Sequence, residues 1–174
     1  MLRTKLKKKL ANEINYVKAN ATGFLVEFLD MVAIRYQLDN VVNLIEGIKN
    51  KVDIDLLMEN IDPLGAFPEL RSVKVLEGDD YSALYREVLI DTPVGPYFVR
   101  FLEEQMTRDQ GEARTMNEVQ NIFKDLKAEY IRNSLKKLWL EDFYDFCEKK
   151  LNPTSEAMMR DLIKFEADFK TIQV

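Results

Sequence analysis

The chain has 174 residues, of which 47% are hydrophobic and 32% are charged; this is typical of one globular domain with its own core. It contains no histidine and a single cysteine, Cys147, which excludes Ser-His-Asp and Cys-His catalysis, histidine-containing zinc sites and an intrachain disulfide. The formal net charge is −5, so a general nucleic-acid-binding surface is not expected.

Two further features concern membranes and cellular compartment. No apolar run approaches the ~18 residues that indicate a membrane-spanning helix. Residues 1–10 combine leucines with lysines and lack the apolar stretch of a secretory signal. We therefore expect no transmembrane segment and no entry into the secretory lumen, and the single cysteine fits a reducing compartment.

Apolar residues recur at helical spacing through the first fifty residues. A strongly basic first helix is expected to carry an apolar row made of Leu6, Leu10, Ile14 and Val17. Residues 20–23 interrupt it, and Thr22 is expected to cap a long second helix. The apolar positions of that second helix are Phe24, Leu25, Phe28, Leu29, Val32, Tyr36, Leu38, Val41, Val42, Ile45 and Ile48.

Shorter elements follow up to about residue 101. A short helix is expected to end near Asn60, and residues 61–65 have the composition of a turn. Helix starts are indicated by the caps Asp53, Asp79 or Asp80, and Thr92 followed by Pro93. Residues 73–76 are the only strand-like segment, and they are too short to build a sheet.

The second half begins with Glu103–Thr115, which is polar, contains Gly111 and has no apolar period, so we expect an exposed loop. From about Asn117 one long helix is expected, ending at Pro153. Its apolar positions are Val119, Ile122, Phe123, Leu126, Tyr130, Leu135, Leu138, Trp139, Phe143, Phe146 and Cys147. The last helix carries Met158, Leu162, Phe165 and Phe169 on one face, with Met159 and Ile163 beside them. It reaches Val174 without a stop signal, which suggests a piece of a longer chain.

These patterns predict an all-α fold, a multi-helix bundle in which residues 1–174 form a single helical domain that is well over half helix. A core position is expected for four aromatic residues, Tyr97, Phe98, Trp139 and Phe143.

Carboxylates supply the first candidates for chemistry. The adjacent pairs are Asp79-Asp80, Glu103-Glu104 and Glu141-Asp142. Neighbouring side chains on a helix point ~100° apart, so such pairs do not converge on one substrate atom and are explained as caps or solvated faces. Glu141, Asp145 and Glu148 do share a helix face, where a divalent cation could bind, but surface ion pairs with Lys137 and Lys149 explain them more simply.

Cys147 and a lysine cluster are the other candidates. Cys147 lies on an apolar row, which indicates a buried, unreactive thiol. The cluster of Lys5, Lys7, Lys8 and Lys9 could meet phosphates or an anionic membrane surface, although a solvated basic face explains it more simply. The glycines stand singly, so no phosphate-binding loop is indicated. No residue is assigned as catalytic, cofactor-binding or metal-binding. Three classes stay open: an interaction or structural subunit, an enzyme with a carboxylate site, and a basic surface-binding module.

Several segments resemble subunit d of the eukaryotic vacuolar-type proton ATPase, which has a distant counterpart in the V/A-type ATPases of archaea and bacteria. They follow the family's order and are Tyr36–Gly47, Asp62–Phe67, Leu84–Tyr85, Val88–Phe98, Tyr130–Leu135, Tyr144–Cys147 and Phe165–Asp168. Two departures are a longer segment from Met106 to about Glu129, and Asp62 with the residue before it, which replace the usual Cys-His of animal members.

The resemblance implies an all-α, funnel-shaped protein of repeated helical units, of which this chain would be the middle portion. It implies a non-catalytic subunit without nucleotide or cofactor, peripheral to vacuolar and other acidic-compartment membranes on their cytoplasmic face. Its partners would be the central stalk subunits and the proteolipid ring, to which it would pass the torque of ATP hydrolysis for proton transport. The residues that contact stalk or ring stay unassigned. The alternative is a helical scaffold or adaptor with a basic amino-terminal helix that binds a membrane surface or phosphate.

Overall fold

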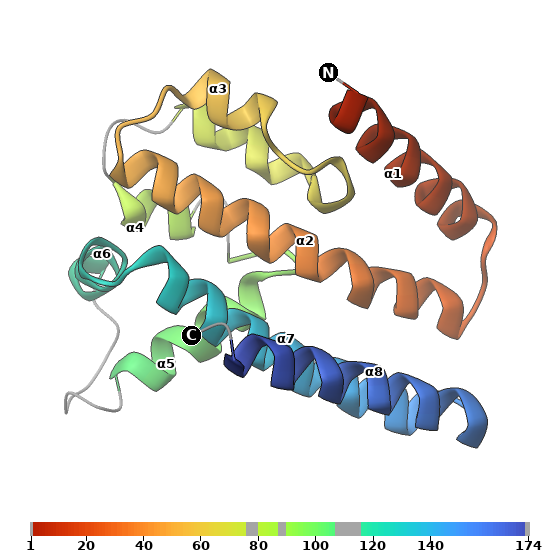
Figure 1. The fold of residues 1–174 in the computed structure, drawn as a ribbon. Coiled ribbons are helices and arrows are strands. Elements are labelled where there is room, and N and C mark those ends of the chain that lie inside the picture. The colour runs from red at the N-terminus through yellow and green to blue at the C-terminus, as the bar shows by residue number, and fades with distance from the viewer. Residues whose placement is uncertain (1, 76–79, 87–89, 107–115, 173–174) are drawn as a thin grey trace.

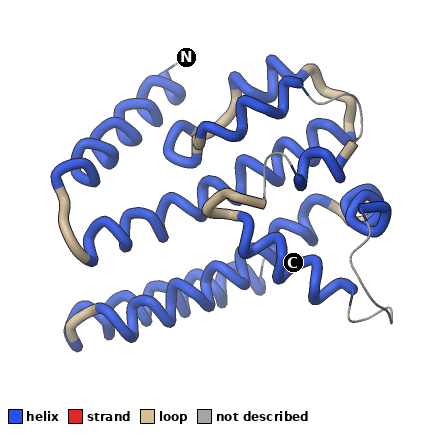
Figure 2. Tube along the Cα trace, turned by 180° about the vertical axis from the view of Figure 1, so that it is seen from behind, coloured by secondary structure: helices blue, strands red, loops and turns tan. Residues whose placement is uncertain are grey.

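The protein is seen in a computed structural model that describes residues 2–75, 80–86, 90–106 and 116–172. Within these residues the regular elements are all helical and no strand occurs (Figure 2). The elements are α1 (Leu2–Asn20), α2 (Phe24–Lys49), α3 (Ile54–Glu59), the 3₁₀ helices η1 (Pro63–Gly65) and η2 (Pro68–Val75), α4 (Tyr81–Leu84), α5 (Gly95–Met106), α6 (Met116–Asp125), α7 (Ala128–Lys150) and α8 (Pro153–Ile172). The prediction of an all-α fold is confirmed. In this part of the chain, no helix has a stretch long and apolar enough to cross a bilayer.

Helix α2 runs through the middle of the arrangement (Figure 1). α1, α3 and η1 lie on one side of it, and α7 with α8 beside it lies on the other. α4, α5 and α6 gather near the carboxyl-terminal end of α2. There α6 packs against both α4 and α5. α2 is therefore the middle layer, between the layer of α1, α3 and η1 and the layer of α7 and α8.

The core lies between the carboxyl-terminal half of α2 and the helices around it. The fully buried residues of α2 include Leu38, Val41, Val42, Leu44 and Ile45. Tyr97, Phe98, Trp139 and Phe143 are all buried, as predicted. The Trp139 ring stacks on Phe143 with 5.3 Å between centroids, and its indole N–H donates to the Met31 carbonyl at 2.8 Å. Burial of each such large side chain stabilises the fold by about 1.5–3 kcal/mol.

Local capping explains where several helices begin. The Asp53 carboxylate accepts the backbone N–H groups of Asp55 and Leu56 at the start of α3, as predicted. Asp80 accepts the Ala83 N–H at the start of α4, while Asp79 lies outside the described residues.

The predicted cap at Thr22 is wrong. Gly23 is the N-cap of α2, with φ 62° and ψ −139° and no side-chain cap bond. Glycine alone adopts this conformation readily, so the turn between α1 and α2 is made by backbone freedom and not by a hydroxyl cap. The helix predicted at Thr92-Pro93 starts later, at Gly95, because residues 91–94 form a turn in which the Gly95 N–H bonds the Thr92 carbonyl at 3.0 Å.

Two predicted segments also differ from the structure. Glu103–Met106 form the last turn of α5, so the loop predicted at 103–115 is wrong for these four residues, and residues 107–115 lie outside the described part. The strand-like segment expected at 73–76 is helical at residues 73–75, which belong to the 3₁₀ helix η2, and residue 76 lies outside the described part. The buried apolar residues of α5, including Phe101 and Leu102, anchor this helix in the core, and the helix continues into the polar residues that follow them.

The single helix predicted from about Asn117 to the break at Pro153 is in fact two helices, α6 and α7. The Lys49 ammonium group at the end of α2 donates to the carbonyls of Lys124 at 2.6 Å and Leu126 at 3.1 Å. It thereby satisfies carbonyl groups that the end of a helix leaves unpaired. No proline or glycine marks this break, and a tertiary contact from α2 lies at it.

The expected apolar rows of α1 and α8 are largely exposed. Leu6 and Leu10 of α1 are 59% and 53% exposed, and Leu162 and Phe165 of α8 are 55% and 70% exposed. In α1 the only fully buried residue of the described set is Ala11. The helical periodicity of these segments is confirmed, but the row does not face the core of this chain.

Glycine is required at one close approach. A Cβ on Gly65 of η1 would lie 2.3 Å from the Tyr36 carbonyl carbon and 2.6 Å from the Gln37 nitrogen, both backbone atoms of α2. At Gly47 within α2, the nearest atoms are the ends of the flexible Leu57 side chain, 2.3 Å away.

We predict that Gly65→Ala lowers the free energy of unfolding by about 1–3 kcal/mol or more, because η1 must move off the backbone of α2. The matched change Gly47→Ala should alter it by less than about 1 kcal/mol, since Leu57 can rotate and alanine favours a helix. Urea denaturation followed by circular dichroism measures both. Equal effects of the two substitutions would contradict the role given to backbone contact.

Candidate functional site

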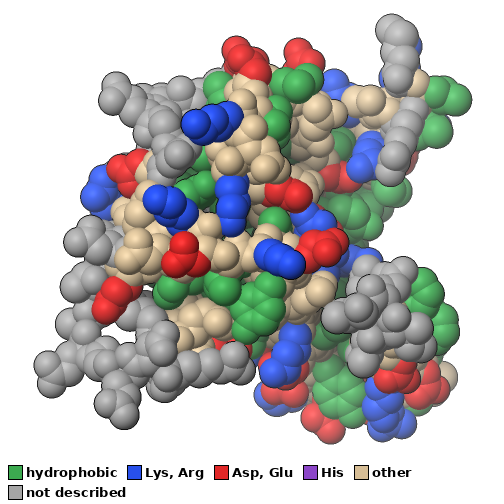
Figure 3. Space-filling model, turned by 60° about the vertical axis from the view of Figure 1, so that its left-hand side comes forward, with side chains coloured by type: hydrophobic (Ala, Val, Ile, Leu, Met, Phe, Trp, Pro, Cys, Tyr) green, Lys and Arg blue, Asp and Glu red, His purple; other side chains and the backbone are tan. Residues whose placement is uncertain are grey.

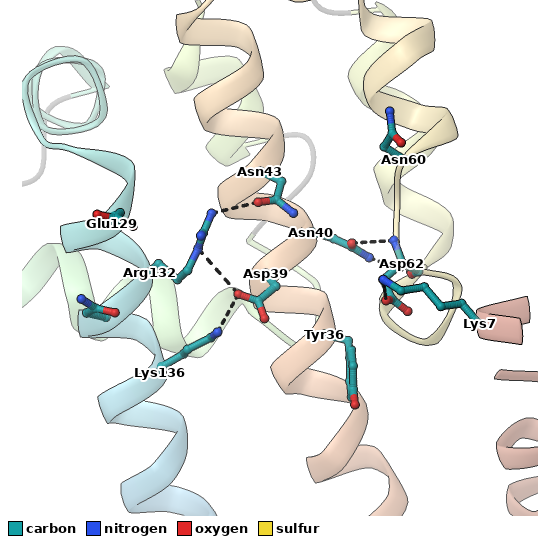
Figure 4. Close-up of a pocket in the computed structure, with 11 residues that line it drawn as sticks. Lys7, Tyr36, Asp39, Asn40, Asn43, Asn60, Asp62, Glu129, Arg132 and Lys136 are labelled. Carbon is teal, nitrogen blue, oxygen red and sulfur yellow. Dashed lines mark hydrogen bonds and ion pairs between the residues drawn. The ribbon is translucent and has the colours of Figure 1, made fainter. Parts of the chain in front are cut away.

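A polar pocket of about 450 Å³ opens between α1, α2, α7 and the segment that enters η1 (Figure 4). It is lined by Lys7, Tyr36, Asp39, Asn40, Asn43, Asn60, Asp62, Glu129, Arg132, Asn133 and Lys136. All of these side chains except the tyrosine are charged or carry an amide. Polar groups from four segments of the chain converge on this pocket, so we take it as the candidate site of the described structure.

Arg132 of α7 spans the gap to α2 at the pocket wall. Its Nη2 donates to Asn43 Oδ1 at 2.8 Å and lies 3.5 Å from Glu46 Oε2, and its Nε lies 3.7 Å from Asp39 Oδ1. Positions 39, 43 and 46 share one face of α2 because they are four and three residues apart. One guanidinium group therefore contacts a polar stripe along the helix.

Lys136 lies one turn after Arg132 and contacts the same carboxylate. Its Nζ is 2.9 Å from Asp39 Oδ1, and its side chain is only 13% exposed. The Arg132 Nε–H is buried and has no hydrogen-bond partner in the structure, although it faces Asp39. Because cations away from water depend on nearby opposite charge, Asp39 holds α7 against α2 at this point.

On the opposite wall, Asn40 fixes the loop before η1. Its amide donates to the Asp62 carbonyl at 3.0 Å and accepts the Asp62 N–H at 2.8 Å, and the side chain is buried. The Asp62 carboxylate accepts the Leu64 N–H and lies 2.6 Å from Lys7 Nζ on α1. Asp62 thus links α1 to the loop before η1, and Lys18 of α1 pairs directly with Asp30 of α2.

The charges of the pocket balance. Its basic side chains are Lys7, Arg132 and Lys136, and its acidic ones are Asp39, Asp62 and Glu129. On the face of the molecule in Figure 3, basic and acidic side chains are likewise interspersed. A balanced, paired site favours polar groups of a partner over a free phosphate, which needs an excess of positive charge. Within the described residues, no group of three or more acidic or thiol side chains is placed to hold a metal ion.

Of the three carboxylates predicted to share a helix face, Glu141 and Asp145 form surface ion pairs with the lysines expected. Glu141 lies 3.8 Å from Lys137 Nζ, and Asp145 lies 3.3 Å from Lys149 Nζ. Glu148 is exposed. All three belong to the described part of the chain, where they do not assemble into a cation site, so the structure gives the divalent-cation hypothesis no support on this face.

Asp142 forms a closer ion pair with Arg100 than Glu141 does. Arg100 of α5 binds both Asp142 oxygens, at 2.7 and 2.8 Å, and this hydrogen bond raises the pKa of Arg100. Burial raises the pKa of Tyr97, and the nearby Asp142 carboxylate raises it further. The cluster joins α5 to α7, which the adjacent Glu141-Asp142 pair in the sequence did not indicate.

Cys147 and the amino-terminal lysines differ in their exposure to solvent. Cys147 is buried, as predicted, and burial raises the pKa of its thiol. Lys7 contacts Asp62, whereas Lys5, Lys8 and Lys9 are exposed to solvent.

Sequence reasoning found the components of this pocket without assembling them. Three segments that carry the family resemblance, 36–47, 62–67 and 130–135, meet around it. Lys7 and Lys136 had no signal that linked them to the site, because their partners lie 55 and 97 residues away in the sequence. The fold and pocket define an all-helical protein whose polar groups join its helices to one another.

Comparisons with known proteins agree with this architecture. Residues 2–174 match the sequence profile of the ATP synthase (C/AC39) subunit family. The V-type proton ATPase subunit d of Dictyostelium discoideum is 36% identical over 166 residues, which are 95% of this chain and 41% of that protein. The proteins of the same name in Saccharomyces cerevisiae and Neurospora crassa are 32% and 35% identical, over 95% and 99% of this chain and 43% of each relative.

The chain belongs to the ATP synthase (C/AC39) subunit family. It spans less than half the length of the curated relatives that it matches.

Asn40→Ala should lower the free energy of unfolding by about 1–3 kcal/mol, because it removes both side-chain hydrogen bonds of the Asp62 backbone. Asn60→Ala is the matched control, since Asn60 also lines the pocket but makes only an exposed bond to the Leu56 carbonyl. Its cost should stay within about 0.5 kcal/mol. Thermal and urea denaturation of the two variants give the comparison, and a control as costly as the test variant would contradict it.

A second prediction concerns alkaline pH. Because the folded state raises the pKa of Tyr97, only the unfolded state releases this proton just above the usual tyrosine pKa of about 10. Stability should therefore fall as pH rises above about 10, by up to ~1.4 kcal/mol per pH unit from this group. Tyr97→Phe should be the less stable protein at pH 8, and its difference from the wild type should shrink between pH ~10 and ~11.5. A constant difference across that interval would refute the assignment.

Proposed function

We propose that this chain serves as part of a non-catalytic subunit d of a V-type proton ATPase. In this role it would connect the central stalk to the proteolipid ring, at the cytoplasmic face of an acidic-compartment membrane. The observation that supports the proposal most directly is the family match over residues 2–174, together with relatives that carry the name V-type proton ATPase subunit d.

The packing of α2 suits an element that transmits torque. Ion pairs with α7 and α8 are spread along its length. Glu27 pairs with Lys150 of α7 at 3.4 Å, and Arg35 makes two contacts with Glu166 of α8, at 2.8 and 3.0 Å. Arg132 adds a third point of contact near the other end. Each exposed ion pair contributes only about 0–1 kcal/mol. Their separation along the helix, with the Trp139 hydrogen bond between them, opposes sliding and rotation of α7 on α2.

The second candidate function is a scaffold with a membrane-surface or phosphate-binding helix. One observation favours it: exposed Lys5, Lys8 and Lys9 lie on α1 beside exposed Leu6 and Leu10. Basic residues next to an apolar row are typical of helices that lie in a membrane interface. The lysines occupy only two turns of a chain whose net charge is −5, so the coupling role is preferred.

A chimera tests the coupling role. In the Saccharomyces cerevisiae relative, the aligned stretch is replaced by this chain, and the chimera is expressed in cells that lack their own copy. We expect it to co-purify with the other ATPase subunits and to restore acidification of the vacuole. The isolated chain should show no ATP hydrolysis.

Two controls separate the outcomes. A chimera with Lys5, Lys8 and Lys9 all changed to glutamine should still restore acidification if the lysines are a solvated face. Loss of acidification in this variant, with binding of the isolated wild-type chain to anionic liposomes, would favour the scaffold with a membrane-surface helix. A stable, folded chimera that fails to assemble with the ATPase would refute the proposal.

A further inference from the structure

Two helices of the chain carry an apolar row that the described structure leaves uncovered. In α1 these residues are Leu2, Leu6, Leu10 and Val17, and in α8 they are Met158, Leu162, Phe165 and Phe169. Each of the eight is between 45% and 74% exposed. Phe165 and Phe169 stack on one another with 6.3 Å between centroids, although both face solvent. Single exposed apolar residues are ordinary, but a continuous row along three or four turns marks a contact surface.

Each exposed row lies on a different face of its helix from the residue that packs into the core of this chain. α8 packs inward through Ile163, which is 6% exposed, and α1 through Ala11, which is 2% exposed. At about 100° per residue, Leu162 and Phe165 lie roughly 100–160° around the helix from Ile163, and Leu10 and Leu6 lie roughly 100–140° from Ala11. A helix with two apolar faces is typically packed between two neighbours. Among the described residues, α1 packs against α2 and η1, and α8 packs against α7, in each case on one side.

We propose that the rows on α1 and α8 pack against further helices of the same family fold, supplied by the part of the subunit that flanks the matched stretch. More than half of each of the three relatives compared lies outside that stretch, so these relatives have enough chain to supply such helices. The spacing of the α8 row, at positions 158, 162, 165 and 169, is the alternation of four and three residues that a facing helix fills. This inference depends on family membership and not on the coupling role.

Other occupants fit the observations less well. The two rows belong to helices on opposite sides of α2 (Figure 1), so one flat membrane surface does not explain both. The α8 row is flanked by Asp161, Glu166 and Asp168 as well as by Lys164, which lacks the basic excess of a helix that binds anionic lipid. A second copy would also cover apolar rows, and the experiment below distinguishes it.

Maleimide labelling tests the proposal on both rows. Leu162→Cys and Leu6→Cys are each made in the isolated chain and in the Saccharomyces cerevisiae chimera, whose flanking cysteines are changed to serine. Control positions are Lys164→Cys on α8 and Asn12→Cys on α1, both exposed and on the polar side of their helices. Buried Cys147 stays in every variant as a common background. Circular dichroism confirms that each variant is folded.

The row positions should label at least about 10-fold more slowly in the chimera than in the isolated chain, because labelling then needs the covering helices to open. The control positions should differ by less than about 2-fold, since they stay exposed in both. Equal labelling of the row positions in chain and chimera would overturn the proposal. So would slow labelling in the isolated chain that depends on its concentration, which identifies a second copy as the occupant, or protection that appears only with anionic vesicles.

Discussion

The seam between α2 and α7 is the interaction on which the rest of the structure depends. Apolar residues of both helices fill its centre, and Arg132 with Lys136 pairs with the polar stripe of α2 along its edge. Because a polar contact is strong only in one register, this stripe fixes how far α7 can slide on α2. α5 and α8 are then attached to α7 through Asp142 and through the turn at Pro153. The positions of α5 and α8 relative to α2 therefore depend on how α7 packs against α2.

On the other side of α2, the loop before η1 has the corresponding role. Asn40 bonds its backbone, and Gly65 lets it approach the α2 backbone more closely than any side chain would permit. Lys7 connects the outer helix α1 to that loop through Asp62. α1 is thus held by this contact, by the partly exposed ion pair of Lys18 with Asp30 of α2, and by a small buried face at Ala11. This is a weak attachment for a helix of 19 residues, and it agrees with a second neighbour for α1.

The fold class and most of the core were predictable because they depend on local periodicity. The row from Leu38 to Ile45 and the aromatic residues of α5 and α7 are spaced for a helix and are buried. The division between α6 and α7 was not predictable, since no proline or glycine marks it and the Lys49 contact at the break comes from more than seventy residues away in the sequence. The pocket was missed for the same reason. Its residues belong to segments that resemble a family, but ion pairs such as Arg132–Asp39 form only once α2 and α7 have been placed together.

Trp139 gives the protein an optical consequence of its packing. It is the only tryptophan of the chain, and it lies where α2, α7 and α8 meet: its indole N–H bonds α2, Phe143 stacks on one side, and the Arg35 guanidinium group lies 5.7 Å from the ring centre. Arg35 in turn is held by Glu166 of α8. Indole emission shifts with local polarity and with nearby charge, so the fluorescence of this one residue reports whether all three helices remain in contact.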